Sequence, residues 1–532
     1  MFVEIVDNEK IINVRPPISK SYAIRYAMAA LLADDIETLE IIAKEKQLCD
    51  DIKNTLAAIY ALIKDDILFC YESALLIRTI SLLAPHYINE IPIYIFIDDA
   101  LKNRLTENLQ KILNITNIKY SIETKKIEEI KSEKEIEEKI AKFYKLEKVF
   151  LKIQENSMKY FELIDDEEKN QSNLQSFSNL CEETRQNLEI KSKRNSEQIN
   201  DVYNELKHCQ KILNNHELLF ENNKNEKCRN SKILEDVFTS FKAIENNLPG
   251  NKEFTFLKLY DNIKSGTYEI DASKTSQLLS GLLMSLPICE GYSVIDVINL
   301  SSKYYVDLTI DVIRHFGVNI ICDKYQRFYI SGGQSYVPAK NISIELDWSA
   351  AANFLVLGAI RGGVCIEGIN FHSKQPDKRI YDFFLDIGIN MELKNDTLIL
   401  YKSVISGFNF NAIDTPDLIP PLIVLALNAQ QACYIQGISR LVYKESNRRD
   451  AILQEFSKLG AKIEIDLEND RFIVNPSKLQ GGEVFSHNDH RIAMALAIAG
   501  MNAKGKVKIQ NSECVSKSYP NFWTDLGLIQ TI

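Results

Sequence analysis

The sequence of 532 residues lacks the patterns that mark several common classes of protein. None of its ten cysteines forms a CxxC pair, so neither a zinc motif nor a disulfide framework is indicated and the cysteines are interpreted as reduced thiols. The formal net charge is -10, whereas proteins that follow nucleic-acid phosphates usually carry a basic excess. We therefore expect no nucleic acid as partner.

Long apolar segments are absent as well. No uninterrupted run of about 18 apolar residues occurs, so we expect no membrane span and no membrane partner. The N-terminus carries Glu4 and Asp7 and lacks the apolar core of a secretory signal. These absences predict a soluble, cytoplasmic protein.

Six segments share one pattern, in which a polar or charged start precedes a small apolar run. They begin at Ser19, Glu72, Thr275, Asp347, Asp417 and Asp489. The spacing is regular except for the second gap, which would match the others if about 130 residues were removed. Helix ends that run into β-branched strands, often through glycine, recur between these segments. The sequence therefore predicts six similar α/β units with one interruption.

The interruption has its own composition. From Lys125 to Asn247 the chain contains neither glycine nor proline, is rich in Glu, Lys and Asn, and carries apolar residues at helical spacing. This pattern predicts long amphipathic helices, as a hairpin or coiled-coil-like bundle, inserted in the third unit. We interpret the insertion as a solvated helical excursion; binding of a partner, or self-association, is the alternative.

Basic residues cluster at the starts of the repeated segments and in two motifs near the C-terminus. They are Lys20, Arg25, Arg78, Lys444, Arg448, Arg491 and Lys517. A helix N-terminus offers unpaired N–H groups and a partial positive charge, so several such ends that face one place form an anion site. An acidic protein with cations at these positions is expected to bind a multiply anionic substrate.

The motifs resemble those of the 5-enolpyruvylshikimate-3-phosphate synthase family, the 3-phosphoshikimate 1-carboxyvinyltransferases. They are SKSYAIR, TSQLLSGLLM, PDLIPPLIVLAL, YKESNRRDAILQEFSKLGA, NDHRIAMALAIAG and CVSKSYPNF, in the family's order. The resemblance implies an α/β fold, a two-domain inside-out α/β barrel with three βαβαββ units per domain. The expected boundaries are 1–18 with 343–532, 19–118 with 254–342, and a helical insertion at 119–253.

The resemblance also implies an activity. The enolpyruvyl group of phosphoenolpyruvate would pass to the 5-hydroxyl of shikimate 3-phosphate with release of phosphate. This reaction requires a proton at the methylene carbon, a base for the attacking hydroxyl, and cations around two phosphates and a carboxylate. No metal or organic cofactor is implied, and a monomer is expected.

Each residue role is carried over from the matching motif. Asp417 would be the base, Lys444 would orient it, and Glu445 would protonate the methylene carbon, while Lys20 would bridge both substrates. Besides Lys20, Asp417 and Lys444, the shikimate 3-phosphate site would include Ser21, Arg25, Thr275, Ser276, Gln277, Ser302, Tyr305 and Arg440. Besides Lys20 and Gln277, the phosphoenolpyruvate site would include Ala74, Arg78, Arg104, Arg448, Arg491 and Lys517. His490 is interpreted as structural.

Several positions depart from the family pattern. Ala74 and Leu75 stand where Gly and Thr are usual, and Ala74 is expected to narrow the pocket and weaken inhibition by glyphosate. Arg440 stands where Asn is common, and Arg104 lacks the proline that usually follows it. None of the first 249 residues is glycine, although relatives use glycine in these turns.

Two alternatives stay open from the sequence. The first is the related transferase that acts on UDP-N-acetylglucosamine, which shares the fold but lacks the KES-x-R and SKS-[YF]-P motifs. The second is a non-catalytic relative in which the insertion binds a partner and the altered second unit has lost activity.

Overall fold

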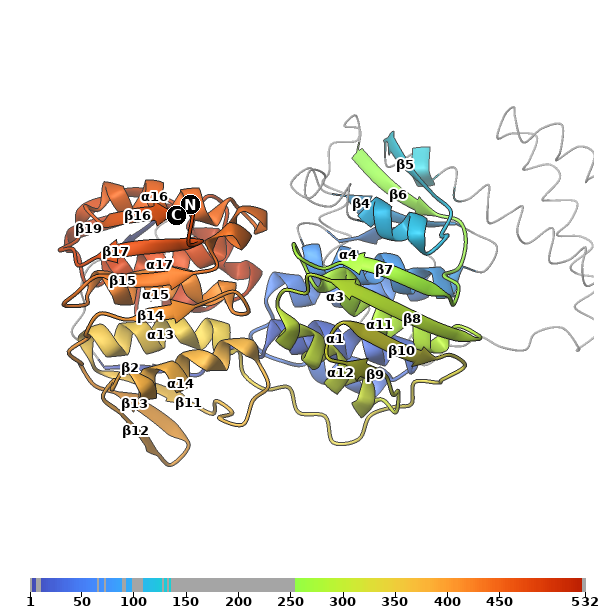
Figure 1. The fold of residues 1–532 in the computed structure, drawn as a ribbon, viewed down its shortest axis with the longest axis horizontal. Coiled ribbons are helices and arrows are strands. Elements are labelled where there is room, and N and C mark those ends of the chain that lie inside the picture. The colour runs from blue at the N-terminus through green and yellow to red at the C-terminus, as the bar shows by residue number, and fades with distance from the viewer. Residues whose placement is uncertain are drawn as a thin grey trace, which may run out of the picture.

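The computed structural model describes residues 2–5, 11–64, 67–70, 73–88, 92–97, 109–126, 129–131, 134 and 254–528. It forms two lobes that lie side by side (Figure 1). The buried hydrophobic residues of the N-terminal lobe form a cluster that extends from Ile18 to Leu346. Those of the C-terminal lobe form a second cluster, with members from Val3 to Val14 and from Trp348 to Leu526. We propose that the two lobes are two domains.

The chain passes between the lobes twice, and the two crossings lie next to each other. Ile18 and Leu346 form an isolated antiparallel bridge. The Ser19 N–H donates to the carbonyl of Glu345 at 2.7 Å, and the Asp347 N–H donates to that of Pro17 at 2.8 Å. These crossings place the start of the first repeated helix beside the start of the fourth.

Four sheets share one strand order. In the N-terminal lobe they are β3 (Leu68–Phe69), β4 (Ile93–Ile97), β6 (Phe254–Leu259), β5 (Tyr120–Lys125), and β7 (Thr267–Asp271), β8 (Tyr292–Ile298), β10 (Arg327–Ser331), β9 (Ile321–Asp323). In the C-terminal lobe they are β2 (Ile12–Val14), β11 (Val364–Glu367), β13 (Thr397–Leu400), β12 (Met391–Lys394), and β14 (Asn409–Asn411), β15 (Cys433–Gln436), β17 (Arg471–Asn475), β16 (Lys462–Asp466). In each, the first two strands are parallel and the remaining pairs are antiparallel. The expected α/β fold class with repeated units is confirmed.

A fifth sheet joins the two ends of the chain. Its strands are β18 (Gln480–Phe485), parallel to β19 (Lys504–Gln510), which pairs antiparallel with β1 (Phe2–Ile5). The C-terminal lobe therefore has three sheets of related pattern. Among the described residues, no sheet closes into a barrel.

The six repeated segments form helices that are buried nearly all round. In the N-terminal lobe these are α1 (Lys20–Leu32), α4 (Ala74–Leu83) and α11 (Gln277–Ser285); in the C-terminal lobe, α13 (Trp348–Arg361), α15 (Ile419–Leu427) and α17 (His490–Gly500). The last three contact one another pairwise in the centre of their lobe. Glycines let α13 and α17 also lie close to their sheets, since a Cβ on Gly358 or Gly500 would press on side chains of the neighbouring strands. No helix in the described ranges is long and apolar enough to cross a membrane.

The first unit departs from the expected βαβαββ pattern. After α1 the described chain forms two helices, α2 (Ile36–Ala43) and α3 (Asp50–Ile63), before it reaches β3. The described N-terminal lobe therefore holds two four-stranded sheets rather than three. The part of this lobe before residue 250 contains no glycine. In its turns Asp34 and Asn117 adopt left-handed φ values of 52° and 56°, which Asp and Asn tolerate better than most residues.

The placement of the insertion needs two corrections. Its flanking strands β5 and β6 pair with each other and with β4, so it interrupts the unit of the second repeated helix, α4, and not the third unit. Residues 120–125 belong to β5, so the start expected at residue 119 falls before a strand of the sheet. Nearly all of the expected helical segment, and Arg104, lie outside the described residues.

Candidate active site

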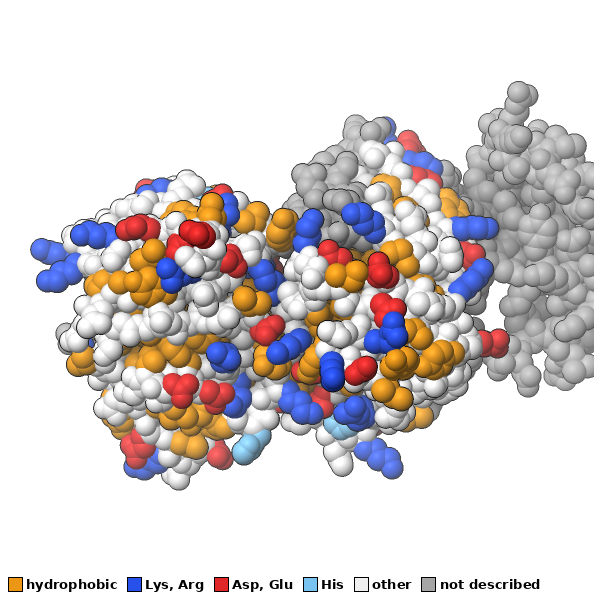
Figure 2. All heavy atoms as spheres, in the orientation of Figure 1, with side chains coloured by type: hydrophobic (Ala, Val, Ile, Leu, Met, Phe, Trp, Pro, Cys, Tyr) orange, Lys and Arg blue, Asp and Glu red, His pale blue; other side chains and the backbone are white. Residues whose placement is uncertain are grey.

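A cavity of about 430 Å³ lies between the lobes. Its described lining includes eight Lys and Arg side chains against four Asp and Glu, although the whole chain is acidic. In the space-filling view, basic side chains lie on both lobes beside their junction (Figure 2). Of the residues expected from the motifs, the cavity brings together Lys20, Ser21, Arg25, Ala74, Arg78, Thr275, Ser276, Gln277, Ser302, Tyr305, Asp417, Arg440, Lys444, Glu445, Arg491 and Lys517. Such a lining attracts anions with several charges.

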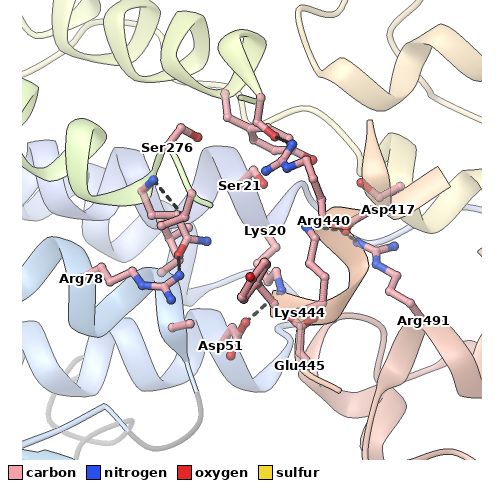
Figure 3. A pocket seen from close by; sticks show the side chains of 18 of the residues that line it. Lys20, Ser21, Asp51, Arg78, Ser276, Asp417, Arg440, Lys444, Glu445 and Arg491 are labelled. Carbon is pink, nitrogen blue, oxygen red and sulfur yellow. Dashed lines mark hydrogen bonds and ion pairs between the residues drawn. The ribbon is translucent and has the colours of Figure 1, made fainter. Parts of the chain in front are cut away.

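Lys20 begins α1 and points into the centre of the cavity (Figure 3). Its Nζ donates to Oδ2 of Asp51 on α3 at 2.9 Å, and its backbone N–H donates to Oδ2 of Asp347 at 3.1 Å. Burial opposes the charge on Lys20, but attraction to Asp51 and Glu445 outweighs burial and holds the pKa above its ordinary value. Lys20 is therefore a firmly charged cation where the two lobes meet.

Arg25 lies one turn further along α1 and is 3% exposed. Its guanidinium donates to Oγ1 of Thr309 at 2.8 Å and to the carbonyls of Ser21 and Tyr305 at 2.9 and 3.3 Å. These partners are neutral, and burial lowers the pKa of Arg25 to about 10. A buried cation held by neutral groups favours an anionic ligand nearby.

The turn before α11 supplies a row of small polar groups. Thr275 Oγ1 accepts from the N–H of Gln277 at 3.2 Å, while Ser276 precedes the helix. The Gln277 side-chain oxygen in turn accepts from Nη1 of Arg78 on α4. Ala74, the first residue of α4, lines the same wall. Two adjacent helix starts thus face the cavity with hydroxyl, amide and guanidinium groups.

Arg440 connects the two lobes across the cavity. Its Nη1 donates to Oγ of Ser302 in the N-terminal lobe and to the carbonyl of Ile413 in the C-terminal lobe, both at 2.6 Å. Ser302 adopts the left-handed φ of 57° just before α12 (Lys303–His315), beside Tyr305. A second link is formed by Lys274, whose Nζ lies 5.2 Å from the centre of the Tyr443 ring. The lobes therefore meet around the cavity.

Asp417 lies at the centre of the cationic cluster (Figure 3). Its Oδ1 accepts from Nζ of Lys444 at 3.1 Å and from Nη1 of Arg448 at 2.8 Å, and Nη2 of Arg491 lies 3.6 Å from its Oδ2. Burial opposes ionisation, but the surrounding cations, above all Lys444 and Arg448, hold the pKa of Asp417 well below its usual range. Burial also lowers the pKa of Lys444, against the attraction of Asp417. Asp417 is therefore an ionised carboxylate.

Arg448 does not line the cavity but lies directly behind it, 1% exposed at the start of α16 (Arg448–Lys458). Besides Asp417, it contacts Glu445 through Nη2 and Oδ2 of Asp489 through Nε, the latter at 2.7 Å. One guanidinium thus orients three carboxylates. These contacts suit Arg448 to arrange Asp417 and Glu445, and its expected part in binding phosphoenolpyruvate stays a prediction.

Arg491 follows the N-cap of α17 and is 4% exposed. Asp489 caps the helix by accepting from the Arg491 N–H at 2.9 Å. Nε and Nη1 of Arg491 have no hydrogen-bond partner among the described residues. Burial, then the charges of Arg491 and Lys20, hold the pKa of the neighbouring His490 well below its ordinary value, so that His490 is neutral. A buried guanidinium group with two N–H donors available suits a carboxylate or phosphate.

Among the lining residues, the motifs did not predict Asp51, Lys274, Ser349, Val442 and Tyr443 as site residues. Asp347 was noted only as the start of a repeated helix, yet it caps α13 and reaches Lys20. Its place at the crossing, beside Ser19, could have suggested this. Lys517 does line the cavity, and its Nζ donates to the carbonyl of Asn488 at 2.8 Å.

Asp377 is a buried carboxyl behind Ser349 that the motifs did not single out. It is 1% exposed, and its Oδ2 accepts a hydrogen bond from Oγ of Ser349. Burial, followed by the negative charge of Asp417, raises the pKa of Asp377 to about 7, against the attraction of Arg491. Near neutral pH this carboxyl therefore retains a proton that an unfolded chain would release.

We expect Asp377→Asn to change how stability depends on pH. Since the folded pKa of Asp377 lies above the unfolded value of about 3.9, the folded state loses stability as the pH rises from about 4 to 7 and then levels off. Asparagine resembles the protonated carboxyl and removes this loss. The difference in Tm between the variant and the parent chain should favour the variant more at pH 8 than at pH 5. A difference independent of pH would contradict the assignment.

The fold and cavity define a class of protein: two-lobed α/β proteins of repeated units with a cationic cavity between the lobes. The family model for EPSP synthase (3-phosphoshikimate 1-carboxyvinyltransferase) matches residues 234–526. The 3-phosphoshikimate 1-carboxyvinyltransferase of Clostridium acetobutylicum is 41% identical over 271 residues, 51% of this chain and 62% of the relative. That of Clostridium kluyveri is 36% identical over 294 residues, 55% and 68% of the two chains. The matched part of the chain thus spans roughly two thirds of these relatives.

Solved structures show the same fold. The EPSP synthase of Acinetobacter baumannii superposes with a TM-score of 0.58, 15% identity, and coverage of 99% of this chain and 97% of that one. The match to the family model covers more than half of the sequence. The chain belongs to the EPSP synthase family.

Proposed function

We propose that the chain transfers the enolpyruvyl group of phosphoenolpyruvate to the 5-hydroxyl of shikimate 3-phosphate and releases phosphate. The observation that carries this proposal is the cavity lined by eight cations, among them a buried Arg491 with two nitrogens that have no partner among the described residues. The two substrates together carry two phosphates and two carboxylates. The relatives named above are carboxyvinyltransferases, which supports the same reaction.

The N-terminal lobe suits shikimate 3-phosphate. Arg25 contributes an uncompensated buried charge, and Thr275, Ser276 and Gln277 offer hydroxyl and amide donors beside it. These groups match the phosphate of this substrate. We propose that Lys20, Ser21, Ser302, Tyr305, Arg440 and Lys444 complete this part of the site.

The opposite part of the cavity suits phosphoenolpyruvate. Arg78 and Arg491 approach it from different lobes, and Lys20 lies between them (Figure 3). Gln277, Ala74 and Lys517 line its walls. Cations on several sides neutralise a carboxylate and a phosphate together, and they stabilise the charge that the leaving phosphate acquires. The role of Arg104 in binding phosphoenolpyruvate stays a prediction.

The proposed chemistry joins the 5-oxygen of shikimate 3-phosphate to C2 of phosphoenolpyruvate while a proton adds to the methylene carbon. Loss of a proton and cleavage of the bond to phosphate then restore the double bond. Asp417 is the proposed base and Glu445 the proposed acid, since both line the cavity and both contact Arg448. The cations that keep Asp417 ionised also weaken it as a base. Bound anions would partly neutralise those cations and raise the pKa of Asp417 in the complex.

Substrate choice separates this proposal from its nearest alternative. The purified chain is mixed with phosphoenolpyruvate and either shikimate 3-phosphate or UDP-N-acetylglucosamine, and phosphate release is followed. We expect release only with shikimate 3-phosphate. Release with the nucleotide sugar would favour the transferase that acts on UDP-N-acetylglucosamine, and no release with either would favour a non-catalytic relative.

The absence of a cofactor, the cytoplasmic location and the monomeric state also stay predictions.

We expect weak inhibition by glyphosate. Ala74 begins α4 and lines the wall where phosphoenolpyruvate is proposed to bind, so its methyl group takes space that glycine would leave open. The variant Ala74→Gly should be inhibited at a glyphosate concentration at least tenfold lower than the parent chain, a difference of about 1.4 kcal/mol. Equal inhibition of the two proteins, measured with the same phosphate assay, would remove Ala74 as the cause.

A further inference from the structure

Glu455 is a buried carboxylate that the proposed chemistry does not use. It lies on α16, is 0% exposed and does not line the cavity. Its Oε2 accepts from the N–H of Phe485 at 2.8 Å and from Nζ of Lys458 at 2.7 Å, and its Oε1 lies 2.9 Å from Nε2 of His487. A buried charge is expensive unless it is fully bonded, and here Phe485 ends β18 while His487 lies in the loop that follows it.

That loop, residues 486–489, connects β18 to α17. His487 and Asn488 both adopt left-handed backbone conformations, with φ of 56° and 54°. Such conformations are unfavourable for residues other than glycine and persist when surrounding contacts fix them. The contact of Glu455 with His487 and the bond to Phe485 fix the loop from the side away from the cavity.

The loop determines where three cations of the site lie. The carbonyl of Asn488 accepts from Nζ of Lys517 at 2.8 Å. Asp489, the next residue, caps α17 ahead of Arg491 and accepts from Nε of Arg448 at 2.7 Å. A shift of the left-handed turn would therefore displace the contacts of Lys517, Arg491 and Arg448 together, and none of the hydrogen bonds named here involves a residue of the N-terminal lobe.

We propose that Glu455 is a positioning residue for the phosphoenolpyruvate side of the site. It acts through His487 and the left-handed turn, and it touches no substrate itself. This inference rests on the proposed function, because it assigns the displaced cations to one of the two substrates. It predicts an asymmetric effect: loss of the Glu455 contacts weakens the binding of phosphoenolpyruvate and leaves the binding of shikimate 3-phosphate nearly unchanged.

The primary test is Glu455→Gln, which keeps the shape of the side chain and removes its charge. We expect KM for phosphoenolpyruvate to rise about tenfold, the change that 1.4 kcal/mol of binding energy produces, and KM for shikimate 3-phosphate to change less than twofold. Glu483→Gln is the matched control, since this glutamate lies on the exposed surface of β18 and its loss should alter neither constant. Equal changes in both constants, or none, would overturn the proposal.

A second variant keeps the proposal testable if Glu455→Gln does not fold. His487→Asn retains a residue that tolerates the left-handed conformation, but its side chain is too short to reach Glu455. It should reproduce the selective rise in KM for phosphoenolpyruvate.

Amide hydrogen exchange gives a readout that does not depend on turnover. In Glu455→Gln and His487→Asn, exchange should accelerate at residues 486–491 and remain unchanged in α1. If the parent chain releases no phosphate, the proposed function fails, but the exchange experiment still tests whether Glu455 holds the loop. Unchanged exchange in both variants would overturn the positioning role even in an active enzyme.

Discussion

Asp417→Asn is expected to lower kcat by about 10³-fold, within the range that general acid–base catalysis usually contributes. Asparagine fits the same space but cannot accept the proton of the attacking hydroxyl. It also removes a carboxylate that contacts Lys444, Arg448 and Arg491 together. The measurement is the rate of phosphate release at saturating concentrations of both substrates.

Two controls make the result for Asp417 interpretable. Asp386→Asn, at the exposed end of α14 (Arg379–Asp386), changes the same chemical group far from the cavity and should keep full activity. The thermal unfolding of Asp417→Asn should also be recorded, because removal of one partner of a buried ion pair destabilises a fold by about 3–5 kcal/mol. A folded Asp417→Asn that retains a tenth of the parent kcat would exclude Asp417 as the base.

The second large effect is expected for Arg491→Lys. Lysine keeps the charge but loses the planar fork whose Nε and Nη1 have no partner among the described residues. If these two nitrogens bind the carboxylate or phosphate of phosphoenolpyruvate, their loss should cost about 3 kcal/mol and lower kcat/KM for this substrate by roughly 10²-fold. KM for shikimate 3-phosphate should change far less.

Arg449→Lys provides the matched control for Arg491. Arg449 lies on the surface of α16 and pairs with the exposed Asp450, so the same substitution there should leave both kinetic constants unchanged. An Arg491→Lys enzyme with normal kcat/KM for phosphoenolpyruvate would show that a point charge suffices at this position. The proposed two-point contact with the substrate would then be wrong.

Much of the fold was predictable because its signals are local and repeated. The six polar-to-apolar segments form the six central helices, and the helix-to-strand turns lead into strands as expected. The segment between Asp34 and Ile63 was not predictable in this way. Its apolar residues suit helices, but no local pattern indicates that the strands expected of this unit are missing. The unit that carries the insertion became clear only from the pairing of β5 with β6, two strands that are far apart in the sequence.

The candidate site was predictable to a similar extent, and the motifs missed some of its residues for a similar reason. Motif residues such as Lys20, Asp417 and Arg491 do meet in one cavity. Asp51 and Asp377 could not be found from their own surroundings in the sequence, because their environment is created by Lys20 and by Ser349, which are distant along the chain. The placement of Arg448 behind the cavity depends on burial, which the KES-x-R motif does not report.

An acidic chain can bind anions because charge is distributed unevenly within it. The described cavity collects cations from both lobes. Asp51 pairs with Lys20 and Asp417 with Lys444, while Glu445 contacts Arg448 behind the cavity. Ligand phosphates and carboxylates would compete with these internal acids for the same cations. We therefore expect binding of the two substrates to change the protonation of the site.

The most direct test of the central claim is phosphorus NMR of the purified chain with phosphoenolpyruvate and shikimate 3-phosphate. We expect both substrate signals to decline together, while inorganic phosphate and one new phosphomonoester grow in equal amounts, and omission of either substrate to stop the change. Phosphate released from phosphoenolpyruvate alone, or no change with a folded chain and both substrates present, would contradict this claim.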